Sequence, residues 1–135
     1  MSAVVDVVVP IRTTSKTNDR DHWRVRAKKT KAERDATAYT IHARDPHAVV
    51  LQYTPKGPRL RFREPPLPCT VTLTRISERY LDDDNVRGAL KAIRDEVAAF
   101  LGVDDRDPRV VWAYAQHKQP RGHFGVRIQI TQEQR

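Results

Sequence analysis

Two short acidic segments contain the side chains best suited to chemistry. The first reads Asp-Asp-Asp-Asn over residues 82–85, and the second places three aspartates within residues 104–107. In an extended segment, residues i and i+2 point the same way, so Asp82 and Asp84 are expected to converge. Two converging carboxylates repel each other unless a cation lies between them, and their hard oxygen atoms suit Mg²⁺ or Mn²⁺. The first segment therefore predicts a divalent metal site.

The second acidic segment follows the next predicted helix and precedes a predicted strand. We expect a return of the chain to bring it beside the first, so that Asp104, Asp105 or Asp107 adds a third carboxylate to the metal site. Such a site could orient a water molecule for phosphodiester hydrolysis. The alternatives are structural, because Asp84 or Asn85 can cap the following helix and residues 104–107 can form an acidic surface turn.

Lys91 is the cation expected beside the first acidic segment. Apolar residues recur at helical spacing after residue 85 and predict one helix over residues 86–101, stopped by Gly102. At about 100° per residue, Lys91 lies within about 20° of Asp84 on that helix. Because helical side chains lean toward the N-terminus, Lys91 is expected to reach a phosphate at the acidic site. The alternative is an ordinary solvent-exposed lysine.

The basic residues are concentrated in the first half of the chain. Residues 1–64 hold 14 Lys and Arg against 7 Asp and Glu, whereas residues 65–135 hold 11 against 10, for a net charge of +8. A basic surface attracts polyanions, so nucleic acid is the leading partner class. The alternative is a basic surface that is merely solvated.

Cysteine usage and hydropathy limit the compartment. A lone Cys69 excludes an intrachain disulfide and is expected to be a small buried thiol. No apolar run approaches the roughly 20 residues that span a bilayer, so we expect no membrane partner and a cytoplasmic location.

Hydrophobic patterning predicts a single α/β domain over residues 1–135, in the order β-α-β-α-β-β. The expected strands cover residues 4–11, 70–76, 110–114 and 124–130, and the expected helices cover residues 27–44 and 86–101. Ala32, Ala36, Tyr39 and Ala43 mark the apolar face of the first helix, whose other faces are basic. Residues 54–68 are expected to form an extended or mobile connection, and the last two strands a hairpin. A mixed sheet with both helices on one face follows.

Residues 80–112 resemble the RusA family of Holliday junction resolvases. The shared pattern is Asp-x-Asp-Asn after a strand, a helix with Lys-Ala-x-x-Asp, a glycine, and an Asp-rich turn before a hydrophobic strand. These features are Asp82-Asp83-Asp84-Asn85, Lys91-Ala92-Ile93-Arg94-Asp95, Gly102, and Asp104–Asp107 before Pro108-Arg109-Val110. Residues 16–18, with Arg20 and Trp23, resemble more weakly the family's Asn-containing loop after its first strand.

The chain departs from the family pattern at the lysine. Lys91 matches the family's lysine only with three residues inserted after Asn85, and the position four after Asp84 is Gly88. Arg87 is the alternative cation. The insertion is nearly one helical turn, which keeps Lys91 on nearly the same face.

The resemblance implies a RusA-like homodimer that binds four-way DNA junctions and makes paired symmetric nicks in DNA recombination and repair. The implied cofactor is Mg²⁺ or Mn²⁺. The implied catalytic residues are Asp82, Asp84, Asp107 and Lys91, and the implied metal ligands are Asp82, Asp84 and Asp107, with Asp105 competing for the third position. The expected DNA-binding residues are Asn18, Arg20, Arg24, Lys28, Lys29, Lys31, Asn85 and Arg87, together with Arg59, Arg61 and Arg63 on the backbone of the DNA arms.

Two other functions stay open. One is a metal nuclease that acts on flaps or replication forks, which a comparison of branched substrates would separate from a junction resolvase. The other is a nucleic-acid-binding protein without catalysis, whose acidic residues only cap helices and form turns. It would bind DNA in a salt-sensitive way and cleave nothing with any metal.

Overall fold

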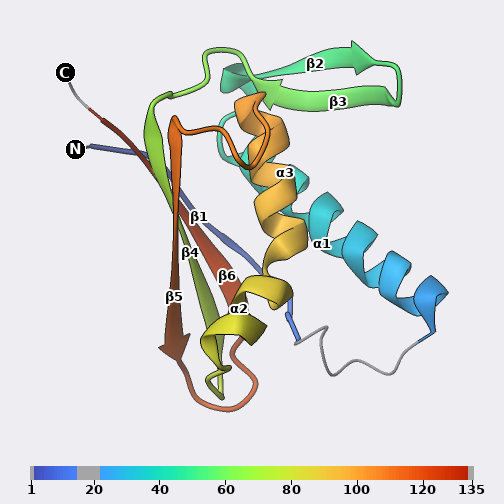
Figure 1. The fold of residues 1–135 in the computed structure, drawn as a ribbon, viewed down its shortest axis with the longest axis vertical. Helices are drawn as coiled ribbons and strands as arrows, with labels where there is room; N and C mark the ends of the chain where they lie inside the picture. Colours follow the sequence, from blue (N-terminus) through green and yellow to red (C-terminus); the bar gives the residue numbers. More distant parts are fainter. Residues whose placement is uncertain (1, 15–21, 134–135) are drawn as a thin grey trace.

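The computed structural model describes residues 2–14 and 22–133. Ten elements follow one another along the chain (Figure 1). They are β1 (Ser2–Val9), α1 (Trp23–Arg44), the 3-10 helix η1 (Pro46–Ala48), β2 (Val49–Thr54), β3 (Gly57–Phe62), β4 (Cys69–Ser77), α2 (Asp83–Ala89), α3 (Lys91–Leu101), β5 (Val110–Lys118) and β6 (Gly125–Gln132). No helix in these ranges is long and apolar enough to cross a lipid bilayer.

The main sheet is mixed, as the sequence predicts. Its four strands lie in the order β1-β6-β4-β5, with β4 and β5 parallel and the other neighbours antiparallel. Helices α1 and α3 lie on the same side of this sheet (Figure 1). The α/β class and the placement of both helices on one face are therefore confirmed.

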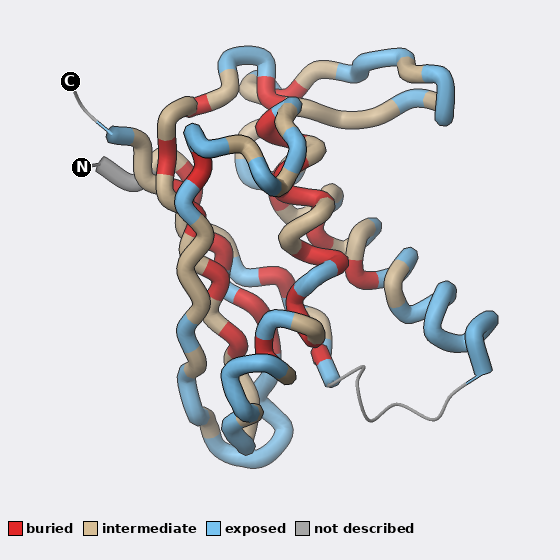
Figure 2. The backbone as a smooth tube through the Cα atoms, viewed as in Figure 1, coloured by how far each residue is buried: buried red, intermediate tan, exposed pale blue. Residues whose placement is uncertain are grey.

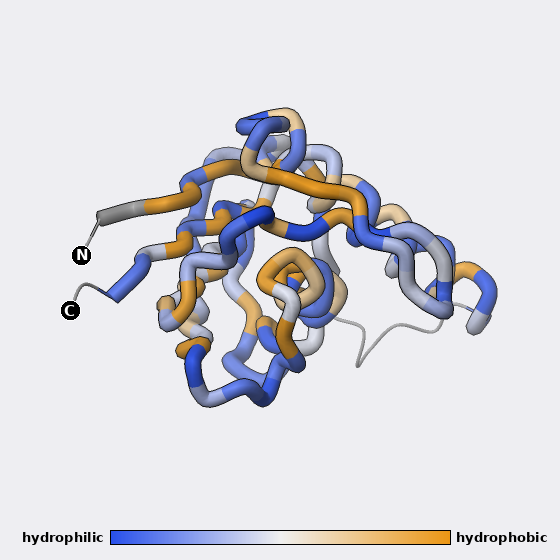
Figure 3. Tube along the Cα trace, turned by 90° about the horizontal axis from the view of Figure 1, so that it is seen from above, coloured by the Kyte–Doolittle hydropathy of each residue, from blue (hydrophilic) through white to orange (hydrophobic). Residues whose placement is uncertain are grey.

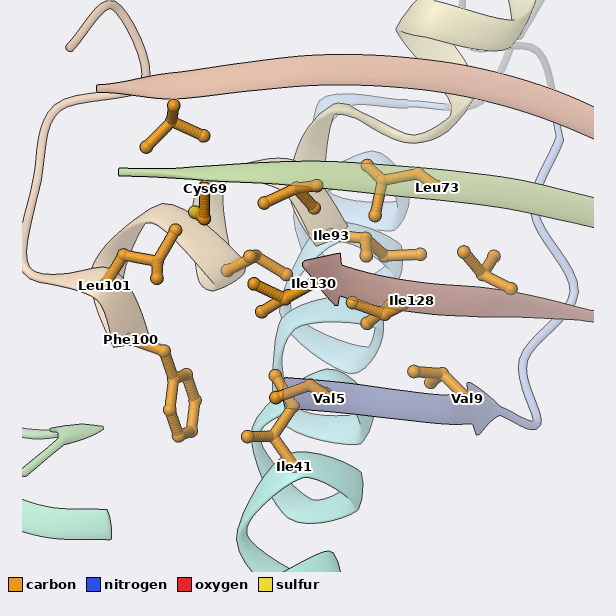
Figure 4. Close-up of a cluster of buried hydrophobic side chains, with 14 of the residues drawn as sticks. Val5, Val9, Ile41, Cys69, Leu73, Ile93, Phe100, Leu101, Ile128 and Ile130 are labelled. Atoms are coloured by element: carbon orange, nitrogen blue, oxygen red, sulfur yellow. The ribbon is translucent and has the colours of Figure 1, made fainter. Parts of the chain in front are cut away.

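Alternation along the strands builds the core. In β4 the side chains of Cys69, Val71 and Leu73 are buried in turn, whereas the threonines between them are half-buried on the open face. Figure 3 shows the same alternation of hydrophobic and hydrophilic residues along the last strand. The buried face packs against α3 through Ile93 and Phe100 (Figure 4). This arrangement fixes the two helices against the sheet and thereby sets where the loops at its ends lie.

Two predicted connections are wrong. Residues 54–68 are not one extended linker, because β2 and β3 pair as an antiparallel hairpin across a tight turn at Gly57, whose φ is 109°. The last two strands do not pair with each other, because β4 lies between β5 and β6. Strand β4, which is distant from β6 along the chain, takes the position beside β6 that a local hairpin would give to β5.

The second predicted helix is broken. The chain leaves helical geometry at Leu90, where φ is −100° and ψ is 3°, so that α2 and α3 are separate helices. The predicted end is confirmed, since Gly102 adopts a left-handed conformation with φ 71° and its N–H bonds to the last turn.

Helix α1 turns a different face to the core from the predicted one. Its buried residues are Glu33, Thr37 and Ile41, whereas Tyr39 is 75% exposed. All residues from 22 to 29 are exposed, so the first two turns project beyond the sheet (Figure 2). This end of the helix is available to a partner.

Candidate functional site

Three strands of the main sheet have their carboxyl ends at the same end of the sheet. Because β1 and β4 are each antiparallel to β6, and β5 is parallel to β4, the strands β1, β4 and β5 run in one direction. Residues 82–85, called the acidic motif below, follow β4 after the four residues 78–81 and lie at this end of the sheet (Figure 1). In open α/β sheets, ligands bind beside the carboxyl ends of the strands. The acidic motif therefore occupies the usual position of an α/β active site.

A buried arginine ties the loop after β1 to the loop after β4. Arg75 is 7% exposed, and it donates hydrogen bonds to the Thr13 carbonyl at 3.1 Å, the Thr13 Oγ1 at 3.2 Å and the Arg79 carbonyl at 2.8 Å. Burial lowers the pKa of Arg75, and the positive charge of Arg12 lowers it further. Arg75 thus holds the chain just before residues 15–21 beside the chain that leads into the acidic motif.

A side-chain amide anchors the start of the acidic motif to β5. The N–H of Leu81 donates to Gln116 Oε1 at 2.8 Å, and Gln116 Nε2 donates to the Leu81 carbonyl at 2.7 Å. This pair satisfies both backbone groups of the residue that precedes Asp82. The motif is therefore fixed to the sheet although it lies in a surface loop.

The acidic motif is at the start of α2 and not in an extended segment. The helix begins at Asp83, with Asp82 as its N-cap, so the expected alternation of Asp82 and Asp84 is wrong and both lie in one N-terminal turn. The Asp82 side chain makes no capping hydrogen bond. The three aspartates are exposed, and their carboxylates form no hydrogen bond or ion pair with any residue in ranges 2–14 and 22–133. Asp82 therefore does not cap the helix, and Asp83 and Asp84 contribute to it only through the favourable interaction of their charge with its N-terminal end.

The two candidate cations differ in their surroundings. Lys91 lies beyond the break at Leu90, so the continuous-helix projection that placed it beside Asp84 does not apply. Its Nζ is 3.1 Å from Asp95 Oδ2. Arg87, by contrast, lines a groove of about 390 Å³ together with Asp83, and its guanidinium lies over the Tyr114 ring at 5.5 Å. The structure places Arg87 next to the acidic motif and pairs Lys91 elsewhere.

Residues 104–109, called the acidic turn below, lie at the opposite end of the sheet (Figure 1). The strands β4 and β5 are parallel and paired over nine residues, from Cys69 with Val110 to Ser77 with Lys118. At roughly 3.3 Å per residue, the two ends are about 26 Å apart. The expected meeting of Asp105 or Asp107 with the acidic motif within one chain is therefore wrong.

The acidic turn uses its carboxylates to shape itself. Asp104 Oδ1 accepts the N–H of Arg106 at 2.9 Å, and Asp105 Oδ2 lies 3.5 Å from Arg94 Nε. Asp107 accepts the Arg109 N–H and side chain at 2.8 to 3.0 Å. These bonds to Arg109 lower the pKa of Asp107 from 3.8 to about 2. The turn thus fits the structural alternative within a single copy.

The acidic motif therefore lacks the third carboxylate that the acidic turn was expected to add. Across the described ranges, no group of three or more His, Cys, Asp or Glu side chains is arranged to hold a metal ion. Mg²⁺ commonly takes only one or two carboxylates from a protein and completes its shell with water and substrate phosphates. Asp82 and Asp84 fit that smaller donor set.

Basic residues line the projecting helix and a groove beside it. Arg24, Lys28, Lys29 and Lys31 are exposed on α1, and Arg24 stacks over the Trp23 ring at 5.3 Å. Lys31 and Arg34 line a groove of about 500 Å³ with Arg59 of the hairpin, where Lys31 is paired with Asp35 at 2.7 Å and Arg34 with Glu96 at 3.4 Å. The fold thus brings together basic residues that are distant in the sequence. The predicted Asn18 and Arg20 lie outside the described residues.

Cys69 is confirmed as a packing residue. Its side chain is 1% exposed in the core, and burial raises the pKa of its thiol to about 11. A thiol that stays protonated at neutral pH is a poor nucleophile.

Sequence reasoning missed the residues that position the acidic motif. Arg75 had a signal, because it occupies an inward position of the alternation that buries Val71 and Leu73. A charged residue at such a position must find buried partners. No sequence signal marks Gln116 or Thr13, since a glutamine or threonine near a strand end is ordinary.

Comparisons of the chain with protein-family models, with curated proteins and with solved structures give no match.

Proposed function

We propose that this protein is a metal-dependent, structure-selective endodeoxyribonuclease that resolves four-way DNA junctions by paired nicks, with Asp82 and Asp84 in its reaction centre. The observation that supports this most is a set of exposed carboxylates beyond the carboxyl end of β4 that have no partner among residues 2–14 and 22–133, on a loop held in place by Gln116 and Arg75. Three exposed aspartates on one turn repel a phosphate, so a cation bound there would let the site approach DNA. The resemblance of residues 80–112 to the RusA family supports the same function.

Each residue of the centre has a definite task in this proposal. Asp82 and Asp84 would hold Mg²⁺ or Mn²⁺, which supplies charge neutralisation and an activated water when bound. Arg87, in the groove beside Asp83, would stabilise negative charge on the phosphate. Lys91 remains the alternative for this task and would have to leave Asp95.

The basic surface suits the backbone of branched DNA. The exposed turns of α1 carry Arg24, Lys28 and Lys29, and Arg59 adds positive charge in the groove beside them. Contacts of this kind position a duplex and do not read its sequence. Selectivity for branched shape over sequence follows.

The test compares a labelled four-way junction, a fork and a linear duplex, each with Mg²⁺, Mn²⁺ or chelator. We expect paired nicks on the junction with metal and none with chelator or on the duplex. Cleavage of forks in preference to junctions would favour a flap or fork nuclease. Salt-sensitive binding without cleavage under any metal would favour the non-catalytic binding protein instead.

A further inference from the structure

The hairpin of β2 and β3 extends away from the main sheet (Figure 1). At its base, Val49 and Phe62 are paired across the two strands and are buried in the hydrophobic core, at 7% and 6% exposed. Toward the tip this burial is lost (Figure 2). Because a pair of strands alone is marginally stable in water, the buried base must hold the outer half in place. The outer half adds little to the core and is accessible to a partner.

One face of the hairpin is apolar from its base to its tip. Directly opposed residues of an antiparallel pair point to the same side, and alternate residues of a strand share a face. The pair Leu51 and Leu60 therefore continues the face that begins at the buried base. The pair Tyr53 and Pro58 extends it to the tip. These four residues are called the apolar stripe below.

The apolar stripe is exposed and its tip is rigidly built. Leu51 is 53% exposed and Tyr53 is 80% exposed. The Thr54 hydroxyl donates to the Gly57 carbonyl at 2.7 Å and accepts the N–H of Lys56 at 3.2 Å, which closes the turn beside Tyr53. A tyrosine held in this way loses little conformational entropy when a ligand covers its ring. The stripe is therefore suited to a flat, apolar ligand.

The charge of the hairpin indicates a polyanion as its partner. Residues 49–63 contain four Lys and Arg and no Asp or Glu. Arg59 lines the groove of about 500 Å³ that the hairpin shares with α1, and Ala27 in the exposed turns of α1 lines the same groove. The hairpin thus continues the basic surface of α1. Flat rings on a phosphate backbone are the bases of a nucleic acid, and their faces are accessible where they are unpaired.

We propose that the β2–β3 hairpin is a single-strand-binding arm, on which Tyr53 stacks against an unpaired base while Arg59 contacts the backbone. This inference rests on the proposed function and names the part of branched DNA that the arm binds, which is the unpaired bases at the branch. Strand β3 leads into the amino end of β4, whereas the acidic motif follows its carboxyl end. The arm therefore lies at the end of the sheet away from the reaction centre and binds DNA at a distance from the cleaved phosphate (Figure 1).

Binding measured in chelator tests the arm independently of cleavage. The probes are labelled oligothymidine, alone and paired with oligoadenosine, read by fluorescence anisotropy with the full chain. Tyr53→Ala should weaken single-strand binding roughly tenfold because it removes one aromatic stack, and should change duplex binding by less than about twofold. Tyr53→Phe keeps the ring and should bind like wild type. Tyr39→Ala removes a tyrosine of α1 that is 75% exposed and should leave both affinities unchanged.

Crosslinking identifies the contact directly. Iodouracil placed in the single strand should attach, on ultraviolet irradiation, to the peptide that contains Tyr53. Crosslinks confined to other segments, equal affinities of Tyr53→Ala and Tyr39→Ala, or a Tyr53→Ala loss as large on the duplex as on the single strand would overturn the arm. Phosphatidylserine vesicles whose binding Tyr53→Ala weakens, with DNA binding unchanged, would also overturn it and indicate an anionic membrane surface instead.

The arm and the proposed function can fail separately. If wild type binds single strands through Tyr53 and cleaves no DNA with any metal, the proposed function fails and the arm stands. If wild type cleaves junctions while Tyr53→Ala binds single strands like wild type, the arm fails and the proposed function stands.

Discussion

The acidic motif and the acidic turn have similar composition and opposite surroundings. In the turn, the carboxylates of Asp104 and Asp107 accept bonds from nearby N–H groups, so their charge stabilises the loop itself. In the motif, the aspartates are exposed without such partners among the described residues, while the backbone around them is fixed by other side chains. A carboxylate that accepts no hydrogen bond within its own loop is the better candidate to bind a metal ion. The comparison therefore separates a reaction centre from a structural turn more sharply than composition does.

Asp84→Asn should lower junction cleavage more than any other change proposed below. A small loss would contradict the contrast between the acidic motif and the acidic turn. Because the side chain is exposed and has no partner among the described residues, its loss should change the unfolding free energy by less than about 1 kcal/mol, while cleavage of a four-way junction falls at least roughly 100-fold. Single-turnover cleavage and urea unfolding measure the two quantities. Asp6→Asn removes an aspartate of β1 far from the motif and should cleave normally. Equal activity of the two variants would remove Asp84 from the centre.

Arg75→Met tests whether buried hydrogen bonds hold together the two loops beside the acidic motif. The change leaves the carbonyls of Thr13 and Arg79 without their donor, which should cost roughly 2 to 3 kcal/mol in unfolding free energy. Arg127→Met removes an exposed arginine paired with Asp6 and should cost less than about 1 kcal/mol. Similar losses in the two variants would mean that Arg75 is not the link between the two loops.

Gln116→Leu addresses the anchor of the motif directly. It removes both hydrogen bonds to Leu81 and should cost about 1 to 2 kcal/mol. Because Asp82 follows Leu81, cleavage should also fall by more than this stability loss explains at temperatures where the variant is folded. Gln129→Leu on β6 is the matched change outside the site. Unchanged cleavage by Gln116→Leu would show that the motif does not need its anchor.

The smallest effect is a pH dependence expected in the acidic turn. The pKa of Asp107 falls from 3.8 to about 2 in the folded protein, so its stabilising effect is present above pH 3.8 and is lost as the pH drops through about 2. Asp107→Asn should therefore be less stable than wild type at about pH 5.5, and the difference should shrink at about pH 2.5. Urea unfolding at both pH values measures it. A pH-independent difference would show that the charge of Asp107 does not hold the turn.

Local patterns predict the parts of this fold that depend on neighbouring residues. The alternation in β4 and β6, the helical spacing before Gly102, and the basic composition of α1 all appear in the structure. The face of α1 was missed because Glu33 and Thr37 are buried polar residues, which hydrophobic patterning cannot find. The spacing of prolines and glycines does not predict the hairpin of β2 and β3, because Gly57 and Pro58 interrupt the strand pattern at the tight turn that needs them.

Long-range pairing explains the errors at the candidate site. Adjacent strands in sequence favoured a hairpin of β5 and β6, but β4 takes the position between them. Because β4 and β5 are parallel, the helices between them must carry the chain back along the sheet. The acidic motif, after β4, and the acidic turn, before β5, therefore lie at opposite ends of the strands. Composition identified both acidic groups, and only the strand order shows that one copy keeps them apart.

Iron-directed cleavage of the polypeptide tests the central claim most directly. Fe²⁺ that replaces Mg²⁺ generates hydroxyl radicals with peroxide and ascorbate, and these cut the backbone next to the bound ion. We expect cuts within residues 81–85 that Mg²⁺ suppresses and that Asp84→Asn abolishes, while Asp6→Asn leaves them unchanged. Cuts confined to other segments, or equal cutting in Asp84→Asn and wild type, would contradict a metal centre at the acidic motif.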